Sequence, residues 1–129
     1  MKTEMELQTN SSGKWIIISA VMGFLGVALG AFGAHSLKPY IDPDKLDVYK
    51  TGTHYQMIHA VVMLAIAFLG DKVYLKAEKF FFAGIILFSF SLYVYSITSV
   101  PAFAMVTPVG GVLFLIGWAV LIYGAVRKT

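Results

Sequence analysis

Three long stretches of this chain carry no full charge. Residues 15–37, 51–70 and 80–126 contain no Asp, Glu, Lys or Arg. A charged side chain at the centre of a bilayer costs about 2.5–3.5 kcal/mol even on insertion scales, so membrane spans are built by excluding charge. A transmembrane helix needs about 20 mostly apolar residues to cross roughly 30 Å of hydrocarbon. The first two stretches therefore predict one crossing each, and the third is long enough for two.

Polar segments and turn residues divide these stretches into four predicted spans. We place the spans at residues 15–34, 53–69, 80–99 and 109–126. The predicted fold class is an all-α membrane protein, a four-transmembrane-helix bundle with short connectors that forms one domain over residues 15–126. We interpret polar residues 1–14 as a flexible cytoplasmic tail and residues 127–129 as a second cytoplasmic tail.

The connector after the first span contains a helix-start signature. Asp42 followed by Pro43 fits an N-cap with proline at the first helical position. Leu46 and Tyr49 then fall on one face, which predicts a short interfacial helix. Gly52 is expected to separate this helix from the second span.

Two prolines divide the long stretch at residues 80–126. We expect Pro101 to close the third span, and Thr107 followed by Pro108 to repeat the cap-and-proline signature and open the fourth. The alternative is a single crossing with a re-entrant segment. Because the prolines lie close together with an apolar run on each side, an antiparallel helical hairpin is favoured.

The Lys and Arg distribution predicts the orientation. The two tails and residues 71–79 carry more basic residues than the other two connectors, where only Lys38, Lys45 and Lys50 occur. Both termini are therefore expected in the cytoplasm, and residues 35–52 outside. The first apolar run is longer than a signal-peptide core, so we expect its helix to be retained in a multi-pass protein of the plasma (inner) membrane.

Composition excludes several classes of protein. Hydrophobic residues make up 58% of the 129 residues, which excludes an ordinary soluble domain. There is no cysteine, which removes disulfides, thiol catalysis and lipidated cysteine anchors. The net charge of +3 comes from residues in connectors and tails, and no basic stripe is interleaved with aromatic residues. We therefore expect a lipid bilayer as the main partner and no nucleic-acid partner.

Glycines form a stripe in the first and in the fourth span. They are Gly23, Gly26, Gly30 and Gly33 in the first, and Gly110, Gly117 and Gly124 in the fourth. Glycine inside a helix costs about 1 kcal/mol relative to alanine, and close backbone approach between membrane helices is the usual reason to keep it. The stripes predict that the first and fourth helices pack closely, or that one stripe mediates self-association or binds a membrane-protein partner. A hinge or a substrate groove is the alternative.

Polar residues gather near the outer end of the second span. Tyr55, Gln56 and His59 share a helix face, while His54 points about 140° away from His59. A partner for His59 would have to come from His35 or from the third span. The candidate pocket or interhelical polar cluster comprises His35, Tyr55, Gln56, His59, Ser89 and Tyr93. Hydrogen bonding between helices, a ligand pocket and proton handling all remain open interpretations.

Catalytic and cofactor-binding patterns are absent from the sequence. No nucleophile elbow, phosphate loop or paired carboxylates occur, so we expect no enzyme activity. Haem would need two axial histidines at facing depth, and zinc would need more ligands than the three histidines offer, so we expect no cofactor or metal. No carboxylate falls inside a predicted span, which argues against proton-coupled export.

Four blocks of sequence resemble one known family. They are Ala28 to His35 followed by Leu37-Lys38, Tyr55 to Ala60, Leu87 to Tyr93, and Thr107 to Gly111 with Gly117-Trp118. In this order they resemble the small YgdD-like membrane proteins, catalogued as domain of unknown function 423 and related to transmembrane protein 256 of animals. The similarity extends over about residues 23–121. The chain departs from the family at Phe90, where glycine is usual, and at residues 52–54, where the family is more apolar.

The resemblance implies a four-helix inner-membrane protein whose single domain fills the chain. It implies no activity, because none is established for the family. Two functional classes therefore remain: a structural or interaction protein such as an accessory subunit, and a small transporter or ligand-binding protein with a polar pocket near the outer face.

Overall fold

The computed structural model describes residues 1–129, apart from the side chain of Gln8. Its helices are α1 (Glu4–Phe32), the π-helical η1 (Gly33–Leu37), the 3-10 turn η2 (Lys38–Tyr40), α2 (Pro43–Leu69), α3 (Lys72–Leu75), α4 (Glu78–Gly84), the π-helical η3 (Ile85–Phe90), α5 (Ser91–Thr98) and α6 (Pro101–Lys128). Because α4, η3 and α5 follow one another without a break, they are called the third helix below.

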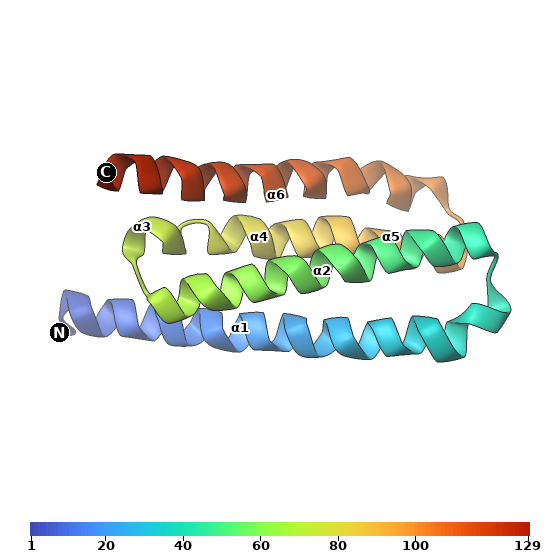
Figure 1. Ribbon diagram of the computed structural model, residues 1–129, viewed down its shortest axis with the longest axis horizontal. Coiled ribbons are helices and arrows are strands. Elements are labelled where there is room, and N and C mark those ends of the chain that lie inside the picture. The colour runs from blue at the N-terminus through green and yellow to red at the C-terminus, as the bar shows by residue number, and fades with distance from the viewer.

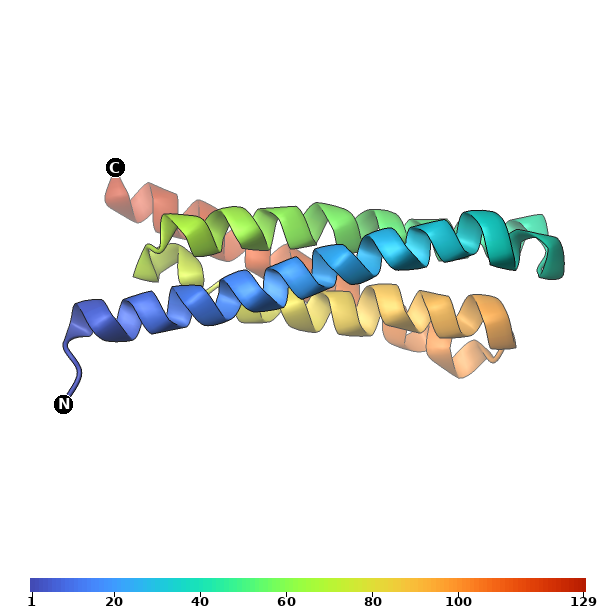
Figure 2. The ribbon, with the colours of Figure 1, turned by 90° about the horizontal axis from the view of Figure 1, so that it is seen from below.

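The structure is a bundle of four long helices, as predicted. All four are long and apolar enough to cross a membrane, and the described residues contain no strand. The chain runs up and down through α1, α2, the third helix and α6, so both termini lie at the same end of the bundle (Figure 1). Figure 2 shows α1 in front of α2 and the third helix, with α6 behind them.

The predicted close packing of the first and fourth helices is wrong. α1 packs on α2, and α6 packs on the third helix; within the part of the chain that is described, α1 and α6 form no comparable interface. Their glycines face different neighbours. A Cβ atom on Gly26 would lie 3.1 Å from Cγ of Met57 on α2, and one on Gly117 would lie 2.6 Å from the ring of Phe81 on α4.

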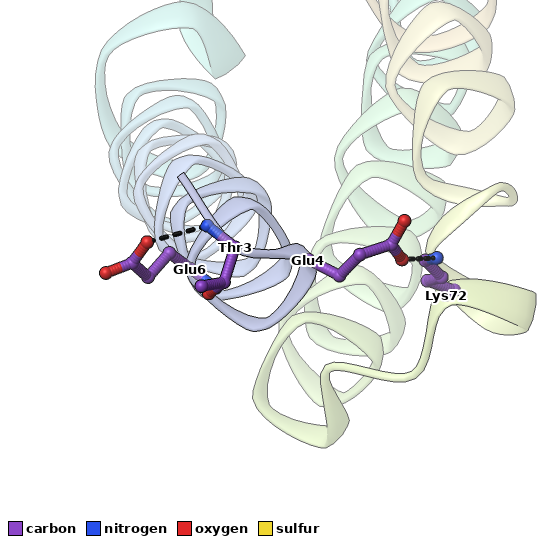
Figure 3. Close-up of polar contacts among 4 residues, drawn as sticks. All are labelled: Thr3, Glu4, Glu6 and Lys72. Atoms are coloured by element: carbon purple, nitrogen blue, oxygen red, sulfur yellow. Dashed lines mark hydrogen bonds and ion pairs between the residues drawn. The ribbon is translucent and has the colours of Figure 1, made fainter. Parts of the chain in front are cut away.

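The first helix begins at Glu4, which corrects the prediction of a flexible tail over residues 1–14. The cause is a capping box. The Thr3 hydroxyl accepts from the Glu6 backbone N–H at 3.2 Å, and the Glu6 carboxylate accepts from the Thr3 N–H at 2.8 Å (Figure 3). Glu4 also forms an ion pair of 2.7 Å with Lys72, which ties this end of α1 to α3.

The last helix begins earlier than expected. The third helix does end shortly before Pro101, at Thr98, as predicted. Pro101 occupies a first-turn position of α6 and Pro108 lies inside that helix, so the prediction that Thr107-Pro108 starts the fourth helix is wrong. The hairpin turns at Ser99, which has a left-handed backbone, and at the extended Val100. Proline inside a membrane helix is tolerated where neighbouring groups satisfy the freed backbone.

The second helix is continuous. Asp42 is its N-cap residue and Pro43 its first residue, as the signature predicts, but Gly52 does not interrupt it. Leu46 and Tyr49 are buried within the bundle, so the expected separate interfacial helix is the first part of α2.

Two glycines bring neighbouring helices against the backbone of η3. A Cβ atom on Gly110 of α6 would lie 2.7 Å from the carbonyl carbon of Leu87 and from Cα of Phe88. A Cβ atom on Gly52 of α2 would lie 3.1 Å from the carbonyl oxygen of Ser89. Contact with backbone atoms cannot be relieved by rotating a side chain. The third helix is therefore held at η3 from two sides.

This contact predicts a contrast between adjacent glycines. Gly110→Ala is expected to destabilise the bundle by about 1–3 kcal/mol, because the new methyl group overlaps backbone atoms of η3. Gly111→Ala meets only the Phe88 ring, at 3.8 Å, and is expected to be neutral or to stabilise α6 by up to about 1 kcal/mol. Unfolding of the purified variants in detergent measures both effects, and equal stabilities would contradict the contact.

Candidate functional site

A buried glutamine joins three of the four helices. The side chain of Gln56, on α2, is fully buried. Its Nε2 donates to the backbone carbonyl of Met22 on α1 at 2.8 Å, and its Oε1 accepts from the Tyr93 hydroxyl on α5 at 2.6 Å. Both ends of the amide therefore bond to other helices, which is how a polar group is accommodated in an apolar bundle.

A second tyrosine extends this connection toward α1. The hydroxyl of Tyr49, on α2, donates to the Leu29 backbone carbonyl at 2.5 Å, and its ring lies 5.0 Å from that of Tyr93. Gly33 leaves room for the Tyr49 ring, since a Cβ atom there would lie 2.7 Å from its Cδ1. Glycine in the first stripe thus admits an aromatic side chain of α2.

The imidazole of His59 connects α2 with α6. Its Nε2 accepts from the indole Nε1–H of Trp118 at 3.1 Å, and its Nδ1 lies 2.7 Å from the Tyr55 backbone carbonyl. Indole can only donate and a carbonyl can only accept, so the imidazole carries its proton on Nδ1. The ring also stacks on Phe114 of α6, with centroids 3.8 Å apart and an angle of 6° between planes.

The remaining histidines do not join this cluster, whereas the Tyr55 ring does: its centroid lies 6.1 Å from that of His59 and 6.2 Å from that of Phe114. His35 lies exposed in η1, and His54 is exposed on α2. The Tyr55 side chain is 39% exposed and packs its ring against Phe88, with centroids 4.7 Å apart. The expectation that His59 takes its partner from His35 or the third helix is wrong, because α6 supplies Trp118.

Two buried polar side chains on the third helix have no hydrogen-bond partner among the described residues. They are the Ser89 hydroxyl in η3 and both carboxyl oxygens of Glu78 in α4. Each side chain is fully buried. An unpaired buried carboxylate is strongly destabilising, so Glu78 is the most unusual polar group in the bundle.

Sequence reasoning missed Glu78 because the third span was started at residue 80. The structure includes Glu78 in a helix that can span the membrane, which corrects the expectation that no span carries a carboxylate. Glu78, Phe81 and Ile85 are three and four residues apart, the spacing of one helix face. Because Phe81 and Ile85 are apolar and buried, this spacing is the signal that assigns Glu78 to the inward face. Trp118 also went unassigned, since nothing in one sequence pairs it with a histidine on another helix.

Four apolar helices, held by hydrogen bonds and glycine contacts in their interior, define a small multi-pass integral membrane protein. Residues 29–111 match the family described as "Protein of unknown function (DUF423)". The chain belongs to this family, and the resemblance seen in the sequence is confirmed.

Its relatives are named as membrane proteins. UPF0382 membrane protein YwdK of Bacillus subtilis is 42% identical over 118 residues, which cover 88% of this chain and 96% of the relative. UPF0382 inner membrane protein YgdD of Escherichia coli K12 is 40% identical over 116 residues, covering 87% and 88%. A UPF0382 membrane protein of Haemophilus influenzae is 39% identical over 118 residues, covering 89% and 95%. No solved structure matches the chain.

The Gln56–Tyr93 hydrogen bond predicts measurable coupling between two helices. In a double-mutant cycle of Gln56→Leu and Tyr93→Phe, the interaction free energy is expected to be about 0.6–1.7 kcal/mol, the range found for hydrogen bonds between membrane helices. The control cycle replaces Tyr93→Phe by Tyr55→Phe, whose hydroxyl makes no hydrogen bond to a described residue. Additive effects for Gln56 and Tyr93 would contradict the bond.

Proposed function

We propose that the protein is a structural or interaction protein of the plasma membrane that self-associates through α1. The observation that carries this proposal is the division of the first glycine stripe. Gly26 and Gly33 are filled by side chains of α2, whereas Cβ atoms on Gly23 and Gly30 would meet nothing within 4 Å. Two glycines with no intramolecular packing role suggest contact with a second molecule, because each costs about 1 kcal/mol relative to alanine.

A second copy of the chain is the occupant that fits this face. Gly23, Val27 and Gly30 lie on one side of α1, with Val27 63% exposed. Beside them a shallow cavity of about 470 Å³ has almost entirely apolar walls from α1 and α2. In a two-fold symmetric pair each α1 presents the same small residues to the other, so the two backbones can approach closely.

The interior polar groups support this class over an enzyme or a transporter. Gln56 and His59 each bond at both polar ends to other groups of the chain. Both side chains are also buried, so neither presents its polar groups to a ligand outside the bundle. One observation favours the alternative of a small ligand-binding protein or transporter, namely the buried and unpartnered Ser89 hydroxyl close to the Gln56–Tyr93 pair.

The absence of cysteine makes self-association directly testable. A single Val27→Cys variant, oxidised in native membranes, is expected to form a disulfide-linked dimer. Gly23→Leu and Gly30→Leu in that background should lower the dimer yield at least tenfold, without loss of folding, because both sites open away from the bundle.

The matched control is Ile122→Cys, which is 65% exposed on α6 and should remain monomeric. Equal cross-linking at both positions, or a dimer unaffected by the leucines, would show that the chains meet by collision and would refute the α1 interface.

We also propose that both termini face the cytoplasm. The end of the bundle that holds them carries most of the Lys and Arg residues, in the tails and in residues 71–79. A membrane-impermeant maleimide added to intact spheroplasts should label Asp44→Cys but should label Thr129→Cys only after lysis. Labelling of Thr129→Cys before lysis would reverse the orientation.

A further inference from the structure

We propose that a groove between α6 and the α3–α4 segment binds one anionic phospholipid. The groove encloses about 660 Å³. Its inner walls are apolar, with Phe80 from α4 and Ile116, Ala119 and Val120 from α6. Its outer end is ringed by cationic residues: Lys76, Lys79, Arg127 and Lys128. An apolar channel that ends in a cluster of positive charge has the two-part chemistry of a phospholipid with an acidic headgroup.

The dimensions of the groove fit one leaflet. From Ile116 to Arg127 the α6 backbone rises about 16 Å, at 1.5 Å per residue. Half of a hydrocarbon core of roughly 30 Å is about 15 Å. With the charged end at the membrane surface, the apolar end of the groove reaches the bilayer midplane, so it can receive an acyl chain along its whole length.

The positive charge at the outer end is largely uncompensated. Lys128 pairs with Asp71, and this contact together with the Val73 N–H lowers the pKa of the Asp71 carboxyl. Among the described residues, Lys76, Lys79 and Arg127 form no ion pair with a carboxylate. Three cations therefore remain available to a phosphate group.

Aromatic rings hold the cations near the headgroup level. The guanidinium of Arg127 lies 5.8 Å from the ring centre of Tyr123, and Nζ of Lys79 lies 5.3 Å from that of Phe80. Tyrosine is favoured at the boundary between hydrocarbon and water. Both rings and both cations line the groove, so the charges are held beside it at the level where a headgroup phosphate would lie.

The opposite end of the bundle lacks this arrangement. Its basic residues Lys38, Lys45 and Lys50 lie in a segment that also carries Asp42, Asp44 and Asp47. The local net charge of these six side chains is zero, so they form no cationic cluster. These lysines therefore offer a matched control, since the same change in total charge can be made there.

Native mass spectrometry of the purified full-length protein tests the proposal. The protein is incubated with equal amounts of phosphatidylglycerol and phosphatidylcholine, and the bound lipids are counted. The wild type is expected to retain one phosphatidylglycerol in preference to phosphatidylcholine. Substituting Lys76, Lys79 and Arg127 together by Gln should reduce that preference at least tenfold, while the triple Gln variant of Lys38, Lys45 and Lys50 should keep it.

A second pair of variants tests the groove itself without a change of charge. Ala119→Phe fills the apolar channel and should abolish retention of the lipid, while Val112→Phe, at an exposed α6 position outside the groove, should leave it intact. Retention in Ala119→Phe would mean adsorption of headgroups to surface charge only. Displacement of the lipid by millimolar glycerol phosphate would mean a soluble phosphate site, and equal loss in both triple variants would mean a general charge effect. Each of these results would overturn the proposal.

Discussion

The packing of α2 and α6 against the backbone of η3 is the contact on which the rest of the bundle depends. Lipid tails are as apolar as leucine, so burial alone gives membrane helices little reason to associate. Close van der Waals contact between helices has to take the place of the hydrophobic driving force, and Gly52 and Gly110 permit that contact. Once α6 is seated there, the Phe114 ring fills the space over Gly84 and comes to stack on His59. The interior hydrogen bonds join groups on helices that these glycine contacts bring close together.

The interior polar groups fall into two sets. Gln56, His59 and Tyr49 bond across helix boundaries and so fix how the helices are rotated relative to one another. Ser89 and Glu78 lie buried on the third helix without a partner in the described residues. The first set explains how a chain of this size holds four helices together in an apolar solvent. The second set lowers stability, because a buried polar group without a hydrogen-bond partner is destabilising, and both of its members lie on the third helix.

The four spans and the family could be predicted from sequence because both are local properties: charge-free runs of sufficient length, and short ordered motifs. Helix boundaries at proline were less predictable. Pro101 and Pro108 are equally good first residues of a helix, and only the turn at Ser99 and Val100 decides between them. Gln56 and Tyr93 were recognised as candidates, but not as a pair. Their hydrogen bond, and the one between His59 and Trp118, depend on how each helix is rotated about its axis, which cannot be predicted from one sequence. The glycine stripes showed that close contacts exist but not which neighbour each one meets.

The π-helical form of η3 has a consequence for how the chain can change over time. A π turn accommodates one residue more than an α turn, and so rotates everything beyond it by about 100° about the helix axis. With this rotation, Phe81 before the turn and Ile85 at its start are buried on the same side of the helix as Tyr93 and Ser96 after it. The same residues wound as an uninterrupted α-helix would swing the second pair toward lipid, whereas loss of one residue within the turn would restore an ordinary α-helix and keep that pair inward. A change of one residue in the length of the third helix is therefore accommodated more readily at η3 than in the α-helical turns on either side of it.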